Sequence, residues 1–80
     1  MASKHQTKII KEMEAKGYYV INLIKTNKNG IADLLCLKDG EPPTFIESKE
    51  KTDTVKPLQA YRIKEQIALG FIAIVSRADK

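Results

Sequence analysis

The chain has one cysteine, no tryptophan and no apolar run near the roughly 18–20 residues that a membrane-spanning helix needs. With Cys36 alone, an intramolecular disulfide is excluded, and no cluster of Cys and His could hold structural zinc. The first residues also lack the apolar stretch of a signal peptide. We therefore expect a cytoplasmic protein in a reducing compartment that does not contact a membrane.

The chain is also short and only moderately basic. Its 80 residues, of which 42% are apolar and 30% charged, predict one globular domain over residues 1–80. A domain of this size buries only about 60% of its unfolded surface, so we expect a homodimer that adds to its stability. Fourteen Lys and Arg against ten Asp and Glu give a net charge of +4, which weakly favours a polyanionic partner such as nucleic acid.

Residue patterns predict six secondary-structure elements. Apolar residues at helical spacing predict helices over residues 3–16 and 57–69, the first capped by Ser3 and the two ended by Gly17 and Gly70. Runs of apolar and β-branched residues predict strands over residues 18–24, 31–38, 44–51 and 71–75. The order αβββαβ implies an α/β fold with one mixed sheet flanked by two helices.

An aspartate and a Glu-x-Lys pair could carry chemistry. Asp33 lies among apolar residues, where a carboxylate needs a cation or an outward orientation. Glu47 and Lys49 are two apart in the next expected strand, so they share a face. Such a pair alone is more often a solvated ion pair. Together with Asp33 it could bind Mg²⁺, which prefers oxygen ligands, and Lys49 could stabilise charge on a phosphodiester during hydrolysis.

In their order and spacing, these residues resemble the PD-(D/E)xK nuclease superfamily and, within it, the virus-type replication-repair nuclease (VRR-NUC) domain, close to the Holliday-junction resolvases. The resemblance spans nearly the whole chain. It depends on Gly30-Ile31-Ala32-Asp33, on Phe45-Ile46-Glu47-Ser48-Lys49, on the helix that opens with Leu58-Gln59 and ends at Leu69-Gly70, and on a first helix that contains Gln6 and ends at Gly17.

This resemblance implies a restriction-endonuclease-like core and a Mg²⁺- or Mn²⁺-dependent endonuclease. Its substrate would be branched DNA, such as four-way (Holliday) junctions, in the repair or recombination of DNA in a bacterial or phage-infected cell. The resemblance also implies that Asp33, Glu47 and the Ser48 carbonyl bind the metal, that Lys49 is the catalytic lysine, and that Gln59 supports the site. A homodimer would supply two equivalent sites for paired incisions.

Other interpretations stay open. The family usually places a Glu early in the first helix, where this chain has Gln6, whose spacing from Ser3 is that of a capping box. The missing acid suggests a non-catalytic DNA-binding or assembly module as an alternative. Gln59 also suits a capping role. Lysines crowd the first helix, the polar loop at 25–30 and the segment after Lys49, and they could flank the site or form a solvated surface of a small structural protein.

Overall fold

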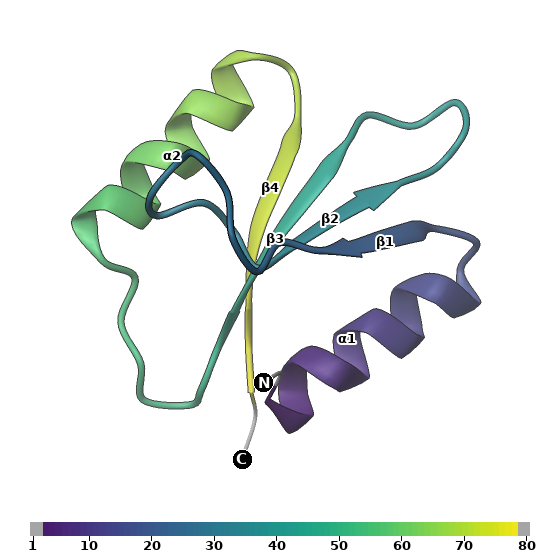
Figure 1. The fold of residues 1–80 in the computed structure, drawn as a ribbon, viewed down its shortest axis with the longest axis horizontal. Coiled ribbons are helices and arrows are strands. Elements are labelled where there is room, and N and C mark those ends of the chain that lie inside the picture. Colours follow the sequence, from purple (N-terminus) through teal and green to yellow (C-terminus); the bar gives the residue numbers. More distant parts are fainter. Residues whose placement is uncertain (1–2, 79–80) are drawn as a thin grey trace.

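The computed structural model describes residues 3–78 and shows one sheet with a helix on each face (Figure 1). The strands lie in the order β1-β2-β3-β4, and all neighbours are antiparallel except the parallel pair β3 and β4. The elements are α1 (Lys4–Ala15), β1 (Tyr19–Asn22), β2 (Leu34–Leu37), β3 (Thr44–Lys49), α2 (Pro57–Ala68) and β4 (Ile72–Arg77). The predicted α/β class, the mixed sheet and the two flanking helices are confirmed.

Both helices begin and end close to the positions that the sequence signals predict. Ser3 caps α1 by accepting a hydrogen bond at Oγ from the Gln6 amide, 3.1 Å away. Gly17 follows with a φ of 89°, in the left-handed region that glycine adopts readily. Pro57 is the first residue of α2, where its missing N–H costs no helical hydrogen bond. Among residues 3–78, no helix combines the length and the apolar character needed to cross a bilayer.

The first turn of α1 is tied to the sheet by two polar side chains. The predicted bond from the Gln6 side chain back to Ser3 is not the contact observed, because the Gln6 amide group donates to Asn22 Oδ1 at 2.9 Å. His5 is half-buried, and its Nε2 lies 3.1 Å from both the carbonyl oxygen and the Oγ of Ser76. These contacts join α1 to β1 and to β4.

The predicted strand boundaries are wrong around the turn between β1 and β2. The strand predicted over residues 31–38 begins only at Leu34, so Asp33 precedes the sheet instead of lying within it. The Leu23 amide donates to the Asp33 carbonyl at 2.7 Å and closes the base of a loop over residues 23–33. The strand predicted over residues 71–75 continues to Arg77, because β4 pairs with β3 as far as Lys49.

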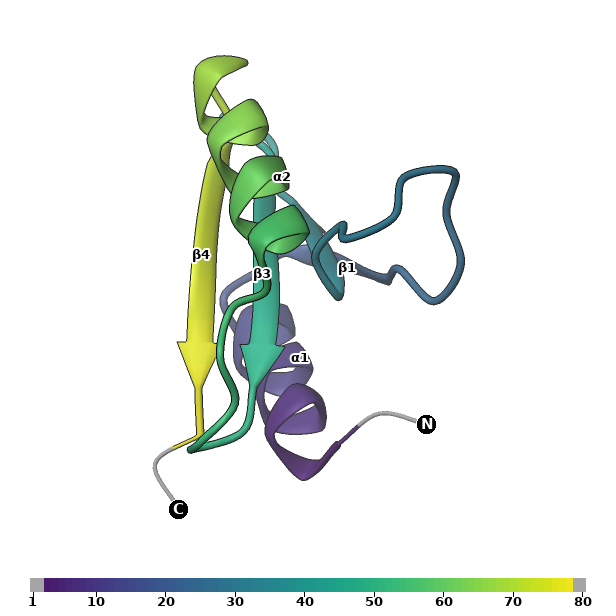
Figure 2. The same cartoon turned by 90° about the vertical axis from the view of Figure 1, so that its left-hand side faces the viewer.

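The two faces of the sheet differ in character. Side chains alternate along β3, so Ile46 faces α1 whereas Phe45, Glu47 and Lys49 face α2. On the α1 face, Ile46 joins a fully apolar core with Ile9, Leu34 and Cys36. In Figure 2 the helices lie on opposite sides of the sheet, with α2 in front of β3 and β4 and α1 behind them. The side chains of Glu47 and Lys49 therefore lie on the face opposite the main core.

Candidate metal-dependent active site

Asp33, which directly precedes β2, contacts Ser48 of β3. The Asp33 carboxylate accepts a hydrogen bond at Oδ2 from the Ser48 amide, 2.8 Å away, in the place that a strand partner would fill. The Lys49 carbonyl accepts from the Ala78 amide and so points towards β4. Because backbone groups alternate along a strand, the Ser48 carbonyl points away from β4, to the same side as the Ser48 amide that Asp33 contacts. Two of the three predicted metal ligands therefore share one edge of β3.

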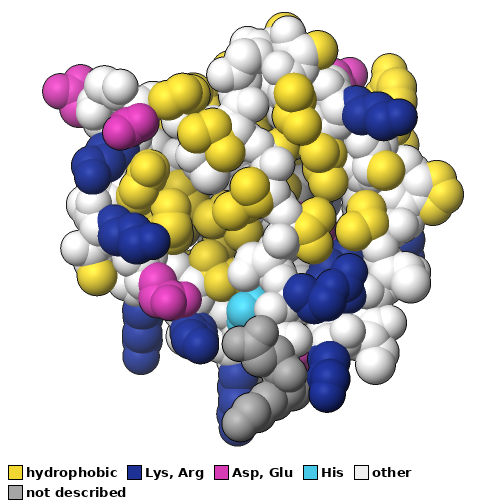
Figure 3. Space-filling model, turned by 180° about the vertical axis from the view of Figure 1, so that it is seen from behind, with side chains coloured by type: hydrophobic (Ala, Val, Ile, Leu, Met, Phe, Trp, Pro, Cys, Tyr) yellow, Lys and Arg dark blue, Asp and Glu magenta, His cyan; other side chains and the backbone are white. Residues whose placement is uncertain are grey.

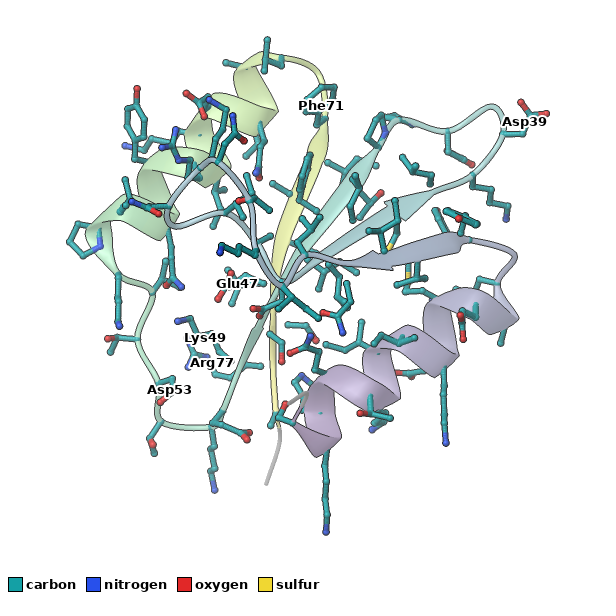
Figure 4. All side chains as sticks on the ribbon, viewed as in Figure 1. Asp39, Glu47, Lys49, Asp53, Phe71 and Arg77 are labelled. Carbon is teal, nitrogen blue, oxygen red and sulfur yellow. The ribbon has the colours of Figure 1, made fainter. Side chains whose placement is uncertain are left out.

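Glu47 and Lys49 form a buried pair on the α2 face (Figure 4). Their side chains are only 7% and 9% exposed, and Lys49 Nζ lies 3.7 Å from Glu47 Oε2. Burial, and then the negative charge of Asp33, raise the pKa of Glu47 to about 7, although Lys49 acts in the opposite direction. The pair is therefore not a solvated surface ion pair, and the Asp33 charge acts directly on Glu47.

Gln59 connects α2 to this buried pair. Its Oε1 accepts a hydrogen bond from the Lys56 amide at 2.9 Å, which satisfies one of the free N–H groups at the start of the helix. Its Nε2 donates to Glu47 Oε2 at 3.0 Å. The Gln59 side chain thus caps the helix through one atom and contacts Glu47 through the other, so the capping role does not prevent contact with the predicted site.

Arg77 adjoins the site and was missed by the sequence analysis. It is the register neighbour of Lys49 in β4, and Figure 4 shows the two side chains close together. Its Nη1 donates to the carbonyl oxygen of Glu50, at 3.2 Å, and to that of Asp53. Arg77 therefore holds the segment that connects Lys49 to α2. The predicted last strand ended at residue 75, which left Arg77 outside the expected sheet.

The donors at this point fit Mg²⁺ better than zinc. Two carboxylates and one carbonyl are the expected ligands, and residues 3–78 contain no group of three or more His, Cys, Asp and Glu that could hold a metal. Mg²⁺ is commonly bound by one or two carboxylates and completes its shell with water and phosphate oxygens. Structural zinc needs four ligands, mostly nitrogen and sulfur. A divalent cation here would also favour the charged form of Glu47, which burial disfavours.

The lysines that were expected to flank the site do not all lie on the Glu47 face of the sheet. The helix α1 covers the opposite face of the sheet, so its lysines do not surround Glu47. The loop that ends at Asp33 carries two cations, and the first turns of α2 carry two more. These four residues are Lys25, Lys28, Lys56 and Arg62.

A search of protein-family models finds no match to this chain, and a search of curated proteins finds no significant match. The resemblance to PD-(D/E)xK nucleases therefore stays a prediction from the motif residues. Any proposal about the function of this chain therefore depends on how those residues are arranged in the structure.

Proposed function

We propose that this chain is a Mg²⁺- or Mn²⁺-dependent endonuclease that hydrolyses phosphodiester bonds in branched DNA, such as four-way junctions, and that its sheet is the core of a PD-(D/E)xK-type nuclease. One observation carries the proposal: the half-buried Asp33 lies close enough to the buried Glu47–Lys49 pair for its charge to raise the pKa of Glu47. Apolar residues in place of a buried ion pair are often neutral or stabilising, so folding alone gives little reason for these charges. A buried carboxylate with a raised pKa, such as Glu47, is typical of active sites.

The chain's own residues have separable tasks in the proposed reaction. A divalent ion at Asp33, Glu47 and the Ser48 carbonyl would lower the pKa of a water molecule and neutralise charge on the scissile phosphate. The Lys49 ammonium can then stabilise the additional negative charge of the transition state. Gln59 holds the Glu47 carboxylate, and the Ser48 amide holds that of Asp33. These hydrogen bonds keep the carboxylates oriented before substrate binds.

The cations near the site support a nucleic-acid substrate. Lys25 and Lys28 lie on the loop that leads to Asp33, and Lys56 is the N-cap residue of α2. Such residues bind the phosphate backbone without reading base sequence. The net charge of +4 acts in the same direction. Recognition would therefore depend on the shape of the DNA, which suits a branched substrate.

The direct test is cleavage of labelled four-way junction, flap and linear duplex in Mg²⁺. We expect Asp33→Asn and Glu47→Gln to abolish cleavage while junction binding persists. Asp39→Asn is the matched control, because Asp39 is exposed in the turn between β2 and β3, far from Glu47 in Figure 4. Failure of the unaltered chain to cut any of the three DNAs would refute the proposal.

A non-catalytic DNA-binding or assembly module is the second candidate. It is favoured by the first helix, where Gln6 stands in the region in which the resembled family has an acid and donates instead to Asn22. This candidate predicts that Asp33→Asn and Glu47→Gln change the stability but leave DNA binding intact, with no cleavage to lose. The cleavage assay distinguishes the two candidates.

We also propose that the chain forms a homodimer through β4. This strand is an edge of the sheet, and Figure 2 shows no other described element beyond it. Five of its six residues are uncharged, and Ile72 and Ile74 are 41% and 47% exposed. An uncharged, open strand edge readily pairs with another chain. A second copy would cover this edge and enlarge a small apolar core.

The apolar surface continues from β4 to α1, as the back view in Figure 3 shows. A hollow of about 140 Å³ between α1 and β4 is lined by Ile9, Met13, Ile46, Ile74 and Ser76, with the charged Glu12 and Lys16 beside them. Because this surface carries one acid and one base, it can pair with the same surface of a second copy related by a two-fold axis, which gives a closed dimer.

Light scattering tests the dimer. We expect the unaltered chain to have twice the monomer mass and Ile74→Glu to have the monomer mass. Ile67→Glu is the matched control, since Ile67 is an exposed isoleucine on α2. A monomer mass for the unaltered chain at every concentration would contradict the proposed dimer but not the proposed chemistry.

A further inference from the structure

The loop over residues 23–33, between β1 and β2, encloses a hollow beside the candidate active site. It stands away from the sheet in Figure 2, and in Figure 1 it reaches towards α2. The hollow has a volume of about 320 Å³, and Asp33 is one of its lining residues. That volume is at the lower end of the range for pockets that hold small ligands. We call this space the loop hollow.

Three hydrogen bonds hold the loop around the hollow: one at its base, one within the loop and one to α2. The Leu23 amide bonds to the Asp33 carbonyl at 2.7 Å, and Thr26 Oγ1 accepts from the Lys28 amide at 3.2 Å. Arg62 Nε donates to the Asn29 carbonyl at 2.9 Å, which attaches the loop to α2. A space that exists before the ligand arrives loses less entropy on binding.

Gly30 strengthens the attachment to α2. Its φ is 79°, and a Cβ built there would lie 2.7 Å from Leu58 Cγ. Only glycine permits so close an approach in this conformation. The loop therefore has a defined position against α2, and the hollow keeps its orientation relative to Asp33.

The lining combines positive charge with one exposed apolar side chain. Lys25 and Lys28 are its cations, and Asp33 is the only acid among its lining residues. Ile24 also lines the hollow and is 87% exposed, so its side chain is open to contact from solvent. Cations beside an exposed aliphatic side chain suit a ligand with phosphates and a flat apolar ring system.

We propose that the loop hollow takes up one unpaired nucleotide of the DNA strand next to the phosphate that Asp33 would address. Lys25 and Lys28 contact the flanking phosphates, and Ile24 packs against the unstacked base. The inference rests on the proposed nuclease function and specifies its substrate. A base inside a duplex must be unpaired and unstacked at a cost of a few kcal/mol, whereas a base at a branch point is already partly free. The hollow would therefore select branched over linear DNA.

Binding without divalent ions tests the inference separately from cleavage. The probe is a short DNA duplex with one unpaired 2-aminopurine nucleotide, compared with the same duplex in which that base is paired. We expect the unpaired probe to bind at least about fivefold more tightly and its fluorescence to change on binding. Ile24→Ser should remove both differences. Leu69→Ser is the matched control, since Leu69 is exposed at the end of α2.

The lysines are tested by the salt dependence of the same binding. Lys25→Ala/Lys28→Ala should lower the slope of log affinity against log salt by about 1 to 2, because each phosphate contact releases close to one counterion. Lys8→Ala/Lys11→Ala is the control, as both residues are exposed on α1.

The results separate this inference from the proposed function. Equal binding of the two probes, or an unchanged preference in Ile24→Ser, would overturn the inference, and cleavage of junctions by the same protein would then leave the nuclease proposal standing. If the protein prefers the unpaired probe, loses that preference in Ile24→Ser and cuts no DNA, nucleotide binding in the loop hollow would be supported and the proposed nuclease activity refuted.

Discussion

The two faces of the sheet show how one strand can serve both stability and chemistry. On the α1 face, β3 contributes Ile46 to a core that includes the fully buried Leu34 and Cys36. On the α2 face, the same strand contributes Glu47 and Lys49, which are buried although they are charged. The alternation of side chains keeps the two sets apart. Truncation of a core residue on the α1 face should therefore lower stability, whereas Glu47→Gln on the α2 face should remove function without lowering stability.

The largest expected effect is on cleavage and comes from the α2 face. Glu47→Gln should abolish junction cleavage, a loss of at least about 1,000-fold in rate, since bound metal contributes several kcal/mol to the reaction. The same variant should be more stable than the parent at pH 8, because it replaces a carboxylate whose ionised form is disfavoured by burial. Cleavage rates and urea unfolding at pH 8 measure the two effects. A variant that lost both activity and stability would contradict the separation of the faces.

On the α1 face, Leu34→Ala should reduce the free energy of unfolding by about 2–5 kcal/mol. Leu34 has no exposed surface, so truncation leaves a cavity in the apolar core. Urea unfolding provides the measurement, and the exposed Leu69→Ala provides a control expected to stay within about 0.5 kcal/mol of the parent. Wherever the variant is still folded, its metal binding should be retained.

The pH dependence of stability should also reflect the α2 face. Unfolded Glu47 loses its proton near pH 4.5, whereas folded Glu47 loses it near pH 7. Between these values the folded state binds more protons, so the free energy of unfolding falls as pH rises, by roughly 3 kcal/mol in total. Urea unfolding from pH 4 to 8 without divalent ions should show this decline. Glu47→Gln should not show it, and saturating Mg²⁺ should reduce it.

The smallest expected effect concerns a buried amide in α2. Gln66 is 4% exposed, and within the described chain neither its Oε1 nor its Nε2 has a hydrogen-bond partner. Such atoms cost about 1–3 kcal/mol, so Gln66→Leu should raise the free energy of unfolding by about 1 kcal/mol. Thermal unfolding would measure the gain, and an unchanged cleavage rate is expected. A loss of stability would show that the amide has a partner in solution, such as water.

The element order was predictable because local signals agree with the fold. Ser3 and Gly17 bound the first helix, Pro57 begins the second, and the four apolar runs form the predicted mixed sheet. Glu47 and Lys49 share a face simply because they are two residues apart on a strand. The spacing of apolar residues and the residues that begin or end helices are sufficient to predict features of this kind.

The remainder depends on contacts between distant segments. Asp33 lies outside its predicted strand, because its carboxylate bonds to the Ser48 amide in place of a ladder partner. Neither the position of Arg77 nor the loop hollow was predicted from the sequence. Their positions follow from the pairing of β4 with β3 and from the packing of Gly30 on Leu58, which no local pattern records.

A crystal soaked in Mn²⁺ would test the central claim most directly. We predict an anomalous density peak between the Asp33 and Glu47 carboxylates, about 2.1 Å from their nearest oxygens and beside the Ser48 carbonyl, and no such peak in Glu47→Gln. Crystals of the unaltered chain with Mn²⁺ elsewhere and none at these carboxylates would contradict the account.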